Sequence, residues 1–315
     1  MEFPPIAPAR ARTRKLAALS RLVRRNQLAG TIRAGASLRG FIDSLPEILA
    51  GADLRELARN IARANRGRRP FIMLSGAHPI KVGLSPIICD LIRDGILNAI
   101  ATNGAAIIHD FEMAFAGRTS EDVGAEISTG NFGMAEETGA FLNRAAGIAA
   151  SESKGLGEVI GREIWNGKLK FRESSIFAAA WRAGAPATVH VALGTDIIHM
   201  HPTADGAAIG QATMNDFHRL TAVVARLSGG VAVNLGSAVV MPEVFLKALN
   251  LARNLGHEVK NFTAADMDFI RQYRPRMNVV ERPTLSGGRA IMLTGHHELM
   301  FPLLIAAVRE ELARR

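Results

Sequence analysis

The amino-acid sequence predicts an α/β fold built on a doubly wound, mostly parallel sheet. Over most of the chain, short apolar runs alternate with longer segments in which apolar residues recur at helical spacing. This alternation is typical of parallel strands connected by helices. Aromatic residues make up only 5% of the sequence, against 48% for all hydrophobic residues. We therefore expect an aliphatic core, as in strands that are buried on both faces.

The expected strands are short apolar runs bounded by glycine, proline or polar residues, and they cover residues 70–74, 96–100, 187–193, 231–235, 257–262 and 277–280. A further apolar run, 290–293, precedes the last helix. Apolar residues at helical spacing predict the main helices, over residues 53–65, 84–94, 136–151, 154–164, 174–183, 214–227, 242–255 and 299–312. Small and polar residues cluster where the strands end, which favours a ligand crevice along the carboxyl edge of the sheet.

The first 40 residues form a basic arm, and residues 41–315 are expected to form a single α/β domain that is nearly neutral. The arm holds nine Lys or Arg and one acid, so it carries +8 of the chain's net charge of +9. Leucines at helical spacing predict an amphipathic helix over residues 13–27. A basic arm suits nucleic acid or an anionic surface, but no nucleic-acid motif accompanies it. We expect it to pack on a neighbouring subunit or to remain mobile, without a nucleic-acid partner.

Cysteine usage and hydropathy indicate the compartment. Cys89 is the only cysteine, which excludes a disulfide framework and a cysteine-based zinc site. It is expected to pack as a small apolar residue, in a protein of a reducing compartment such as the cytoplasm. No apolar run reaches the roughly 18 residues of a membrane span, and the N-terminus lacks the apolar core of a signal peptide. We therefore expect no membrane partner.

The stretch from Ala101 to Glu112 follows the second expected strand and leads into a helix. Asn103 and Gly104 suit a tight turn there, and a glycine lets a ligand approach the backbone closely. His109 stands within two helical turns of this corner, and a histidine in that position is suited to moving protons. In an open α/β sheet a strand–helix corner of this kind faces the ligand crevice.

Other strand ends carry groups that suit a dinucleotide. No Gly-x-Gly-x-x-Gly follows the first strand and no Walker loop is present, so a dinucleotide would bind through dispersed corners. Asp196 follows the third expected strand and Glu281 follows the sixth, and both carboxylates suit the hydroxyls of a ribose. Backbone N–H groups at glycines suit phosphate. The candidate cofactor contacts are Ser75, Asn103, Gly104, Asp196, Gly229, Gly230 and Glu281.

Two further kinds of chemistry are compatible with these strand ends. Histidines suit a metal-dependent hydrolase or lyase, and the candidate ligands are His78, His109, His199, His201 and His296. Lys81 is the only lysine in an expected strand-end loop. A lysine in a dry crevice forms imines or acts as a base.

Three of these corners resemble strand-end motifs of the deoxyhypusine synthase superfamily. Residues 100–110, Ile-Ala-Thr-Asn-Gly-Ala-Ala-Ile-Ile-His-Asp, are similar to the family's Thr-Ala-Gly-Gly-x-Glu-Glu-Asp. Residues 192–196 resemble its Ala-Leu-Thr-Asp-Gly, and residues 228–231 resemble its Gly-Gly-Gly-Val. The resemblance implies a Rossmann-like fold, NAD at the carboxyl edge of the sheet, and a homotetramer with sites at subunit contacts. It also implies that His109 and Asp110 replace acidic groups of the family's site.

The chain departs from the family at its chemical centre. The imine-forming lysine that the family carries near the C-terminus has no counterpart, because no lysine follows Lys260. Transfer of an aminobutyl group onto a protein lysine is therefore not expected.

The sequence thus predicts an NAD-binding enzyme of this superfamily that acts on a small metabolite bearing an amine or a hydroxyl group. His109 or His296 would move protons, Glu298 would orient a histidine, and Lys81 is the candidate for an imine. The alternatives are a metal-dependent hydrolase or lyase and a non-catalytic binding protein that kept the fold.

Overall fold

The computed structural model describes residues 1–314. The chain divides into two compact units, Met1–Ala52 and Asp53–Arg315. Helix α1 (Leu38–Ser44) belongs to the first unit, so it crosses residue 40, where the arm was expected to end. Within residues 1–314 no helix is long and apolar enough to cross a membrane.

Residues 13–27 do not form the predicted amphipathic helix. This part of the first unit contains only single-turn 3₁₀ helices, at Pro8–Arg10, Leu16–Ala18 and Arg25–Gln27. Leu16 and Leu22 are exposed to 69% and 93%. A helix of this length is marginal in water unless an apolar face packs on another element, and the adjacent basic side chains repel one another.

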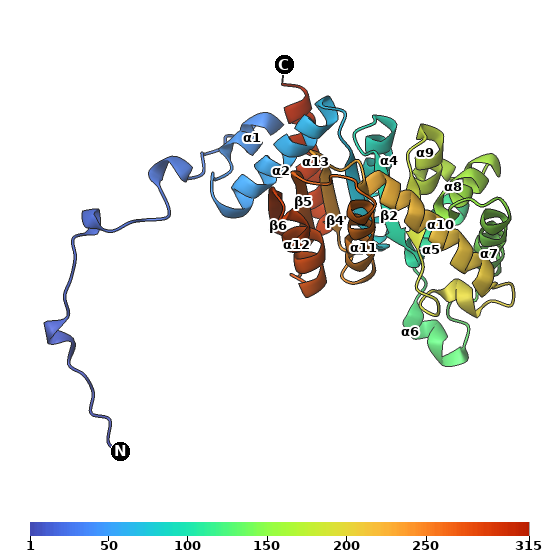
Figure 1. Cartoon of the computed structure of the whole chain (residues 1–315), viewed down its shortest axis with the longest axis horizontal. Helices are drawn as coiled ribbons and strands as arrows, with labels where there is room; N and C mark the ends of the chain where they lie inside the picture. Colours follow the sequence, from blue (N-terminus) through green and yellow to red (C-terminus); the bar gives the residue numbers. More distant parts are fainter. Residues whose placement is uncertain (315) are drawn as a thin grey trace. The chain divides into compact units, whose positions relative to one another are not determined.

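The second unit is built on a six-stranded sheet in the order β3-β2-β1-β4-β5-β6, in which every neighbouring pair is parallel (Figure 1). In the central register, Leu74 of β1 lies between Ala101 of β2 and Asn234 of β4. Helices flank the sheet (Figure 1), and the predicted doubly wound α/β fold is confirmed. The strands are β1 (Phe71–Ser75), β2 (Ala99–Asn103), β3 (Ala187–His190), β4 (Val231–Leu235), β5 (Phe262–Asp268) and β6 (Gly288–Thr294).

The predicted strands at residues 257–262 and 277–280 are wrong. β5 begins at Phe262 and ends in a buried acid, Asp268, so its second half does not read as an apolar run. The apolar run at 277–280 lies instead in a π-helical segment, Pro275–Glu281, which continues into α12 (Arg282–Thr284). A four-residue apolar run does not distinguish a strand from one buried turn of helix.

Most of the predicted helices are present with shifted ends. Helix α7 matches its predicted range, whereas α10 begins eight residues before its predicted start, where Asp205 accepts hydrogen bonds from the backbone of Ala207 and Ala208. Such a side-chain cap satisfies N–H groups that lack partners within the helix. The helices are α2 (Leu49–Arg66), α3 (His78–Lys81), α4 (Ser85–Arg93), α5 (Gly104–Ala116), α6 (Val123–Glu126), α7 (Glu136–Ser151), α8 (Leu156–Asn166), α9 (Ile176–Ala183), α10 (Gly206–Val224), α11 (Val240–Asn254) and α13 (His297–Leu312).

The core lies between the sheet and the helices that cover it. Ile72 and Leu74 of β1 and Met241, Phe245 and Leu249 of α11 belong to one buried cluster, and each is at most 1% exposed. Burying a side chain of this size stabilises the fold by about 2–3 kcal/mol. The aliphatic character of the strands agrees with burial of the sheet on both faces.

A buried carboxyl group joins α10 to α8 and β3. Asp216 of α10 is 1% exposed, and it accepts hydrogen bonds from the backbone N–H of Gly157 (3.0 Å) and Val189 (2.9 Å). A Cβ added at Gly155 would lie 1.9 Å from Asp216 Oδ1, so only glycine allows this approach. Burial raises the pKa of Asp216 to about 7, while the donated hydrogen bonds act to lower it.

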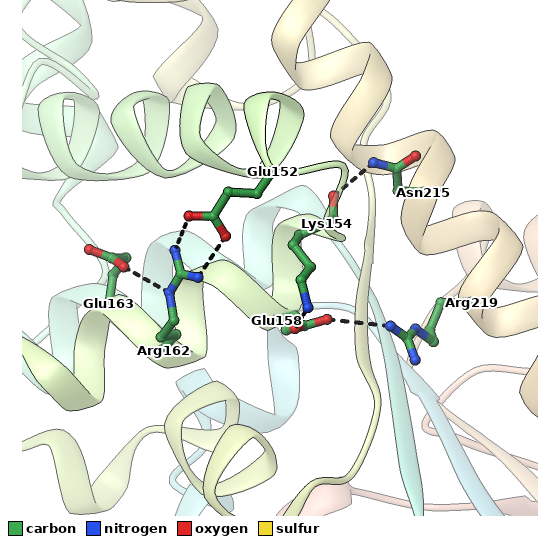
Figure 2. Close-up of polar contacts among 7 residues, drawn as sticks. All are labelled: Glu152, Lys154, Glu158, Arg162, Glu163, Asn215 and Arg219. Carbon is green, nitrogen blue, oxygen red and sulfur yellow. Dashed lines mark hydrogen bonds and ion pairs between the residues drawn. The ribbon is translucent and has the colours of Figure 1, made fainter.

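Ion pairs on the surface fasten α7, α8 and α10 together (Figure 2). Arg162 of α8 donates to both oxygens of Glu152, beside the end of α7, at 2.7 and 2.9 Å. Glu158 of α8 pairs with Lys154 at 2.7 Å and with Arg219 of α10 at 3.4 Å. Two of these helices, α7 and α10, flank the loop that follows β3. This loop carries part of the site described next.

Candidate functional site

The carboxyl ends of the six strands lie along one edge of the sheet. β1 sits between β2 and β4, so the chain leaves β1 towards one side and crosses to the other side after β3. Loops that leave neighbouring strands in opposite directions open a crevice between them. Ser75 ends β1 at this switch in chain direction and is 3% exposed. Ser75 therefore lies at the carboxyl edge of the sheet, and its predicted contact with a cofactor stays a prediction.

At the end of β2, the side chain of Asp196 lies against Gly104 and that of Asn103 lies beside Gly76. A Cβ added at Gly104 would lie 2.0 Å from Asp196 Oδ2, and one added at Gly76 would lie 3.5 Å from Asn103 Nδ2. The Asp196 carboxyl therefore packs against the first turn of α5, where the helix dipole favours negative charge. Burial raises the pKa of Asp196, and nearby His199 acts to lower it.

The loop after β3 is held by His199, in the 3₁₀ helix Ile197–Met200. Its Nδ1 accepts hydrogen bonds from the backbone N–H of Gly194 (3.1 Å) and Asp196 (3.2 Å). A neutral imidazole that accepts at Nδ1 carries its proton on Nε2. That Nε2 is buried and has no partner within residues 1–314, as is the case for Asn103 Oδ1 and Asp196 Oδ2. Asn143 of α7 fixes the same loop by donating to Ile198 O at 3.0 Å.

A cavity of ≈ 160 Å³ adjoins this corner and is lined in part by α5. Three carboxyl groups and one ammonium group line it, from Glu112, Glu121, Asp196 and Lys81. His109 also lines the cavity, so the structure brings together three residues that the sequence singled out, at the ends of β1, β2 and β3. The remaining lining residues are Ala105, Ile108, Ser120, Val123, Phe132, Thr195 and Ile197.

His109, Thr119 and Glu112 form a chain of short hydrogen bonds. His109 Nδ1 lies 2.6 Å from Thr119 Oγ1, and that hydroxyl lies 2.5 Å from Glu112 Oε2. A carboxylate only accepts, so the single hydroxyl proton of Thr119 goes to Glu112. Thr119 must then accept from His109 Nδ1–H. The imidazole is thereby fixed with a bare Nε2, which has no partner within residues 1–314.

The environment of His109 keeps its imidazole neutral. Burial lowers its pKa from 6.5 to about 4, and the positive charge of Lys81 adds to this effect. A neutral imidazole with a bare Nε2 is a proton acceptor. Lys81 itself is exposed on the short helix α3, so the dry crevice expected for an imine-forming lysine is not formed around it.

Asp110 does not face the cavity, contrary to the role that the family resemblance implied. It is 1% exposed and accepts hydrogen bonds from Ser175 Oγ (2.5 Å) and the backbone N–H of Ile176 (2.7 Å). These contacts fasten α5 to the start of α9, and burial raises the pKa of Asp110 to about 6. Asp110 follows His109 directly, so the helix turns its side chain about 100° away.

His296 and Glu298, which were predicted to move protons and to orient a histidine, do not lie at the His109 corner. Both residues follow β6, at the far edge of the sheet, and their side chains are 69% and 46% exposed. His296 Nδ1 lies 3.8 Å from Glu298 Oε1. Four strand spacings separate β6 from β2, about 19 Å, so neither side chain reaches the cavity beside α5.

A second group of polar side chains lies at the ends of β4, β5 and β6. His297 is 1% exposed and its Nε2 lies 3.0 Å from Met267 O. A Cβ added at Gly236 would lie 2.4 Å from the His297 ring, which explains the glycine there. Asn234 donates to Asp266 at 2.8 Å, and burial raises the pKa of Asp266 to about 6.

Three predicted cofactor contacts lie at the wrong edge of the sheet. Gly229 and Gly230 precede β4, and a Cβ added at Gly230 would lie 2.4 Å from Pro70 O at the start of β1. Glu281 lies in the π-helical segment between β5 and β6. The glycines were expected near the carboxyl edge because their spacing resembles a family motif, but here they open the strand and face the amino edge.

Within residues 1–314, the histidines that the metal-dependent alternative would use do not form a metal-binding cluster. His199 Nδ1 faces its own loop, and His201 Nε2 lies 2.9 Å from Gly133 O. Over residues 1–314, no three His, Cys, Asp or Glu side chains are placed to hold a metal ion together. A His-x-His pair binds a metal only if both rings point to one side, which backbone contacts prevent here.

Glu112, Thr119 and Glu121 belong to this site, although no role was predicted for them from the sequence. Glu112 follows His109 by three residues, a spacing that places both on one face of a helix, and this signal was available. Thr119 and Glu121 come from the connection between α5 and α6. No sequence pattern indicated that this connection folds back over α5.

No known family profile and no curated protein sequence matches this chain. Several solved structures share its fold. Cyanobacterial ArgZ, an arginine dihydrolase of the ornithine–ammonia cycle, aligns with a TM-score of 0.52 and 12% identity over 83% of this chain and 32% of its own. AgrE in a ternary complex with ornithine and NAD⁺ aligns with a TM-score of 0.53 and 11% identity, over 84% of this chain and 34% of its own.

A protein of Entamoeba histolytica, provisionally assigned as a deoxyhypusine synthase, aligns over most of both chains. Its TM-score is 0.51 and its identity 13%, over 87% of this chain and 93% of its own. By contrast, this chain spans about a third of the length of ArgZ and AgrE. The predicted deoxyhypusine synthase-like fold is therefore confirmed.

Proposed function

We propose that this protein is an NAD-binding enzyme that acts on a small metabolite bearing an amine or a hydroxyl group. The observation that carries the proposal is the set of buried polar atoms without partners at the ends of β2 and β3: Asn103 Oδ1, Asp196 Oδ2 and His199 Nε2. Nearly all buried polar atoms in proteins have a hydrogen-bond partner. These three therefore mark a place where a polar ligand completes the hydrogen bonding.

The residues at this corner fit the ribose of a dinucleotide better than its diphosphate. Asp196 and Asn103 offer bare acceptor oxygens that suit ribose hydroxyls. The first turn of α5 does not suit phosphate, because the Asp196 carboxyl already fills the space in front of Gly104. A diphosphate is better placed at the end of β1, where Gly76 leaves the backbone open beside Asn103 of β2.

The chemistry that NAD would supply when bound is redox chemistry: it accepts a hydride from a carbon that carries an amine or a hydroxyl group. The proton released in such a reaction needs a base, and His109 is the best placed in this chain. Its neutral state and its bare Nε2 are maintained by burial and by Thr119 and Glu112. Its Nε2 would take the proton from the metabolite's amine or hydroxyl group.

The charge of the cavity supports an amine as the substrate's polar group. Glu112, Glu121 and Asp196 contribute up to three negative charges against the single positive charge of Lys81. Glu121 is held in place because one of its oxygens accepts from Gly133 N at 2.8 Å. A volume of ≈ 160 Å³ suits a small metabolite. The fold shared with AgrE, whose complex contains ornithine and NAD⁺, supports the same choice.

Calorimetric titration with NAD tests the proposal. The wild-type protein should bind NAD. Asp196→Ala should weaken binding by about tenfold or more and Asn103→Ala by about two- to tenfold, since a hydrogen bond contributes about 1.5–3 kcal/mol to a charged group and about 0.5–1.5 kcal/mol to a neutral one. Asn166→Ala, at the exposed end of α8, is the control and should bind like the wild type. His109→Gln should leave NAD affinity unchanged while removing turnover of any amine substrate found by screening.

Native mass spectrometry of the purified protein complements the titration. It should detect bound dinucleotide and an assembly of four subunits. Absence of NAD binding by the wild-type protein at millimolar concentration would overturn the proposal. Unchanged NAD affinity in both Asn103→Ala and Asp196→Ala would instead show that the cofactor binds away from the ends of β2 and β3.

A further inference from the structure

Trp165, near the end of α8, is covered by two guanidinium groups. Arg172 Cζ lies 4.0 Å and Arg182 Cζ lies 4.1 Å from the centre of its ring. Two guanidinium groups at this distance overlap if they share a face, so they cover opposite faces of the indole. Arg172 is further fixed because its Nη1 donates to Trp165 O at 2.8 Å. Stacking on an aromatic face holds a guanidinium plane in one orientation.

These groups line a cavity of ≈ 230 Å³, whose lining residues come from α4, α8, α9 and the 3₁₀ turn Arg172–Ser174. Arg93, in the last turn of α4, is a third guanidinium on its wall, and Glu173 is the only acid. The lining thus carries a net charge of +2. Arg182 makes no hydrogen bond or ion pair within residues 1–314, so its N–H groups are available to a ligand.

The arrangement selects one class of ligand. Both faces of the Trp165 indole are occupied, so a nucleobase has no aromatic surface on which to stack. What remains accessible is the set of guanidinium N–H groups, which match the oxygens of a phosphate or carboxylate in paired geometry. A net charge of +2 favours a dianion over a monoanion.

No residue that lines this cavity also lines the cavity beside His109. The two are on different parts of the second unit, so the cavity at Trp165 is not a portion of the proposed NAD and metabolite site.

We infer that the cavity at Trp165 is a binding site for a compact dianion, either inorganic phosphate or the phosphate group of a small phosphomonoester. Arg182 holds two of the oxygens through paired hydrogen bonds, and Arg93 and Arg172 contribute positive charge on the cavity wall. The site is built from helix ends rather than from the strand ends of the sheet.

Tryptophan fluorescence provides a direct test, because the chain has only two tryptophans. In a Trp181→Phe background Trp165 is the only one, and titration with inorganic phosphate at constant ionic strength should change its emission saturably. A parallel titration with glycerol 3-phosphate, a phosphomonoester, distinguishes the two ligands. Tighter binding of glycerol 3-phosphate than of inorganic phosphate would indicate a phosphomonoester, and the reverse would indicate inorganic phosphate. Arg182→Gln should weaken binding by about tenfold or more, and Arg182→Lys, which keeps the charge but loses the paired geometry, should fall between.

Arg219→Gln is the matched control, because Arg219 is an exposed arginine on α10 that lies outside this cavity. It should bind phosphate like the parent protein. An equal response to chloride at the same ionic strength would overturn the inference, as would unchanged phosphate affinity in Arg182→Gln. If Arg182→Gln loses its fold by circular dichroism, Arg93→Gln takes its place with the same expected loss.

Discussion

At the scale of single residues, the hydrogen-bond chain from Glu112 through Thr119 determines the state of His109. The direction of each bond follows from counting protons, because a carboxylate has none to give and a hydroxyl has one. The result is an imidazole whose Nε2 is bare. Burial and Lys81 prevent this nitrogen from being protonated at neutral pH. Each of these contributions is separable by substitution.

Removing the charge of Lys81 should raise the pKa of His109. In Lys81→Met we expect the His109 pKa to rise above about 4 and to remain below 6.5, because burial is the larger cause of its depression. Nuclear magnetic resonance titration of the imidazole measures this value directly. Lys247→Met, which removes a lysine paired with Glu243 on α11, should leave it unchanged. An unaltered His109 pKa in Lys81→Met would show that the two groups do not interact.

His109 should also make stability depend on pH. Its pKa is about 4 in the folded state and 6.5 ordinarily, so between these values the unfolded chain binds a proton that the folded protein does not. Stability is therefore lost as pH falls from 6.5 to 4, by up to about 3 kcal/mol. His109→Gln removes this loss, so its stability relative to wild type should rise by that amount on going from pH 7 to pH 4.

Denaturant unfolding at several pH values measures this difference. The raised pKa values of Asp110, Asp216 and Asp266 act in the opposite direction, but they are present in both proteins and cancel in the comparison. His257→Gln, at an exposed position, serves as the control and should show no such change. A pH-independent difference between His109→Gln and wild type would contradict the depressed pKa.

At the scale of elements, the corner between β2 and α5 joins two strand ends. Gly104 lets the Asp196 carboxyl, which follows β3, approach the first turn of α5. The end of the helix is thereby compensated by a side chain of this chain rather than by a ligand phosphate. The glycine that resembles a phosphate contact in sequence is thus needed for packing between the β2 and β3 corners.

Gly104→Ala should destabilise the protein by about 1–3 kcal/mol, the usual cost of overpacking, because the added Cβ would lie 2.0 Å from Asp196 Oδ2. The double variant Gly104→Ala/Asp196→Gly should recover most of this loss. Gly147→Ala is the control, since no atom lies within 4 Å of its added Cβ in α7, and it should stabilise by up to about 1 kcal/mol. Thermal unfolding measures the stability of each variant. Equal effects of Gly104→Ala and Gly147→Ala would refute the close contact between Gly104 and Asp196.

At the scale of the whole molecule, the positive charge and the fold are carried by different segments. Residues 1–40 carry +8 of the net charge of +9, whereas the sheet and its helices lie in the second unit. The basic segment contains large apolar side chains that are exposed, among them Phe3 (87%) and Ile6 (94%). It therefore contributes little buried surface of its own.

Deletion of residues 1–23 should leave the thermal stability of the protein nearly unchanged. The expected shift in melting temperature is below about 2 °C, which for a domain of this size corresponds to less than 1 kcal/mol. Differential scanning calorimetry measures it, with a low and a high protein concentration as the internal control. A larger, concentration-dependent fall would indicate that the arm stabilises an assembly of subunits.

The sequence by itself determined the fold class and the identity of the β2–α5 corner. Buried parallel strands and amphipathic helices have different apolar periodicities, and both are local properties that the chain order preserves. His109, Asn103 and Asp196 were recognisable because strand ends on one edge of a parallel sheet must lie near one another. Local patterns failed where a run was too short or was interrupted by buried acids, as in the 277–280 segment and β5.

Only the tertiary structure decided which corners meet. The order β3-β2-β1-β4-β5-β6 separates His296 from His109 by four strand spacings, and the position of Gly229 and Gly230 before β4 places them at the amino edge. The partners Thr119 and Glu121 come from a connection that folds back over α5. Contacts of this kind depend on long-range packing, which no spacing along the chain encodes, because residues distant in sequence are brought together only when the sheet is assembled.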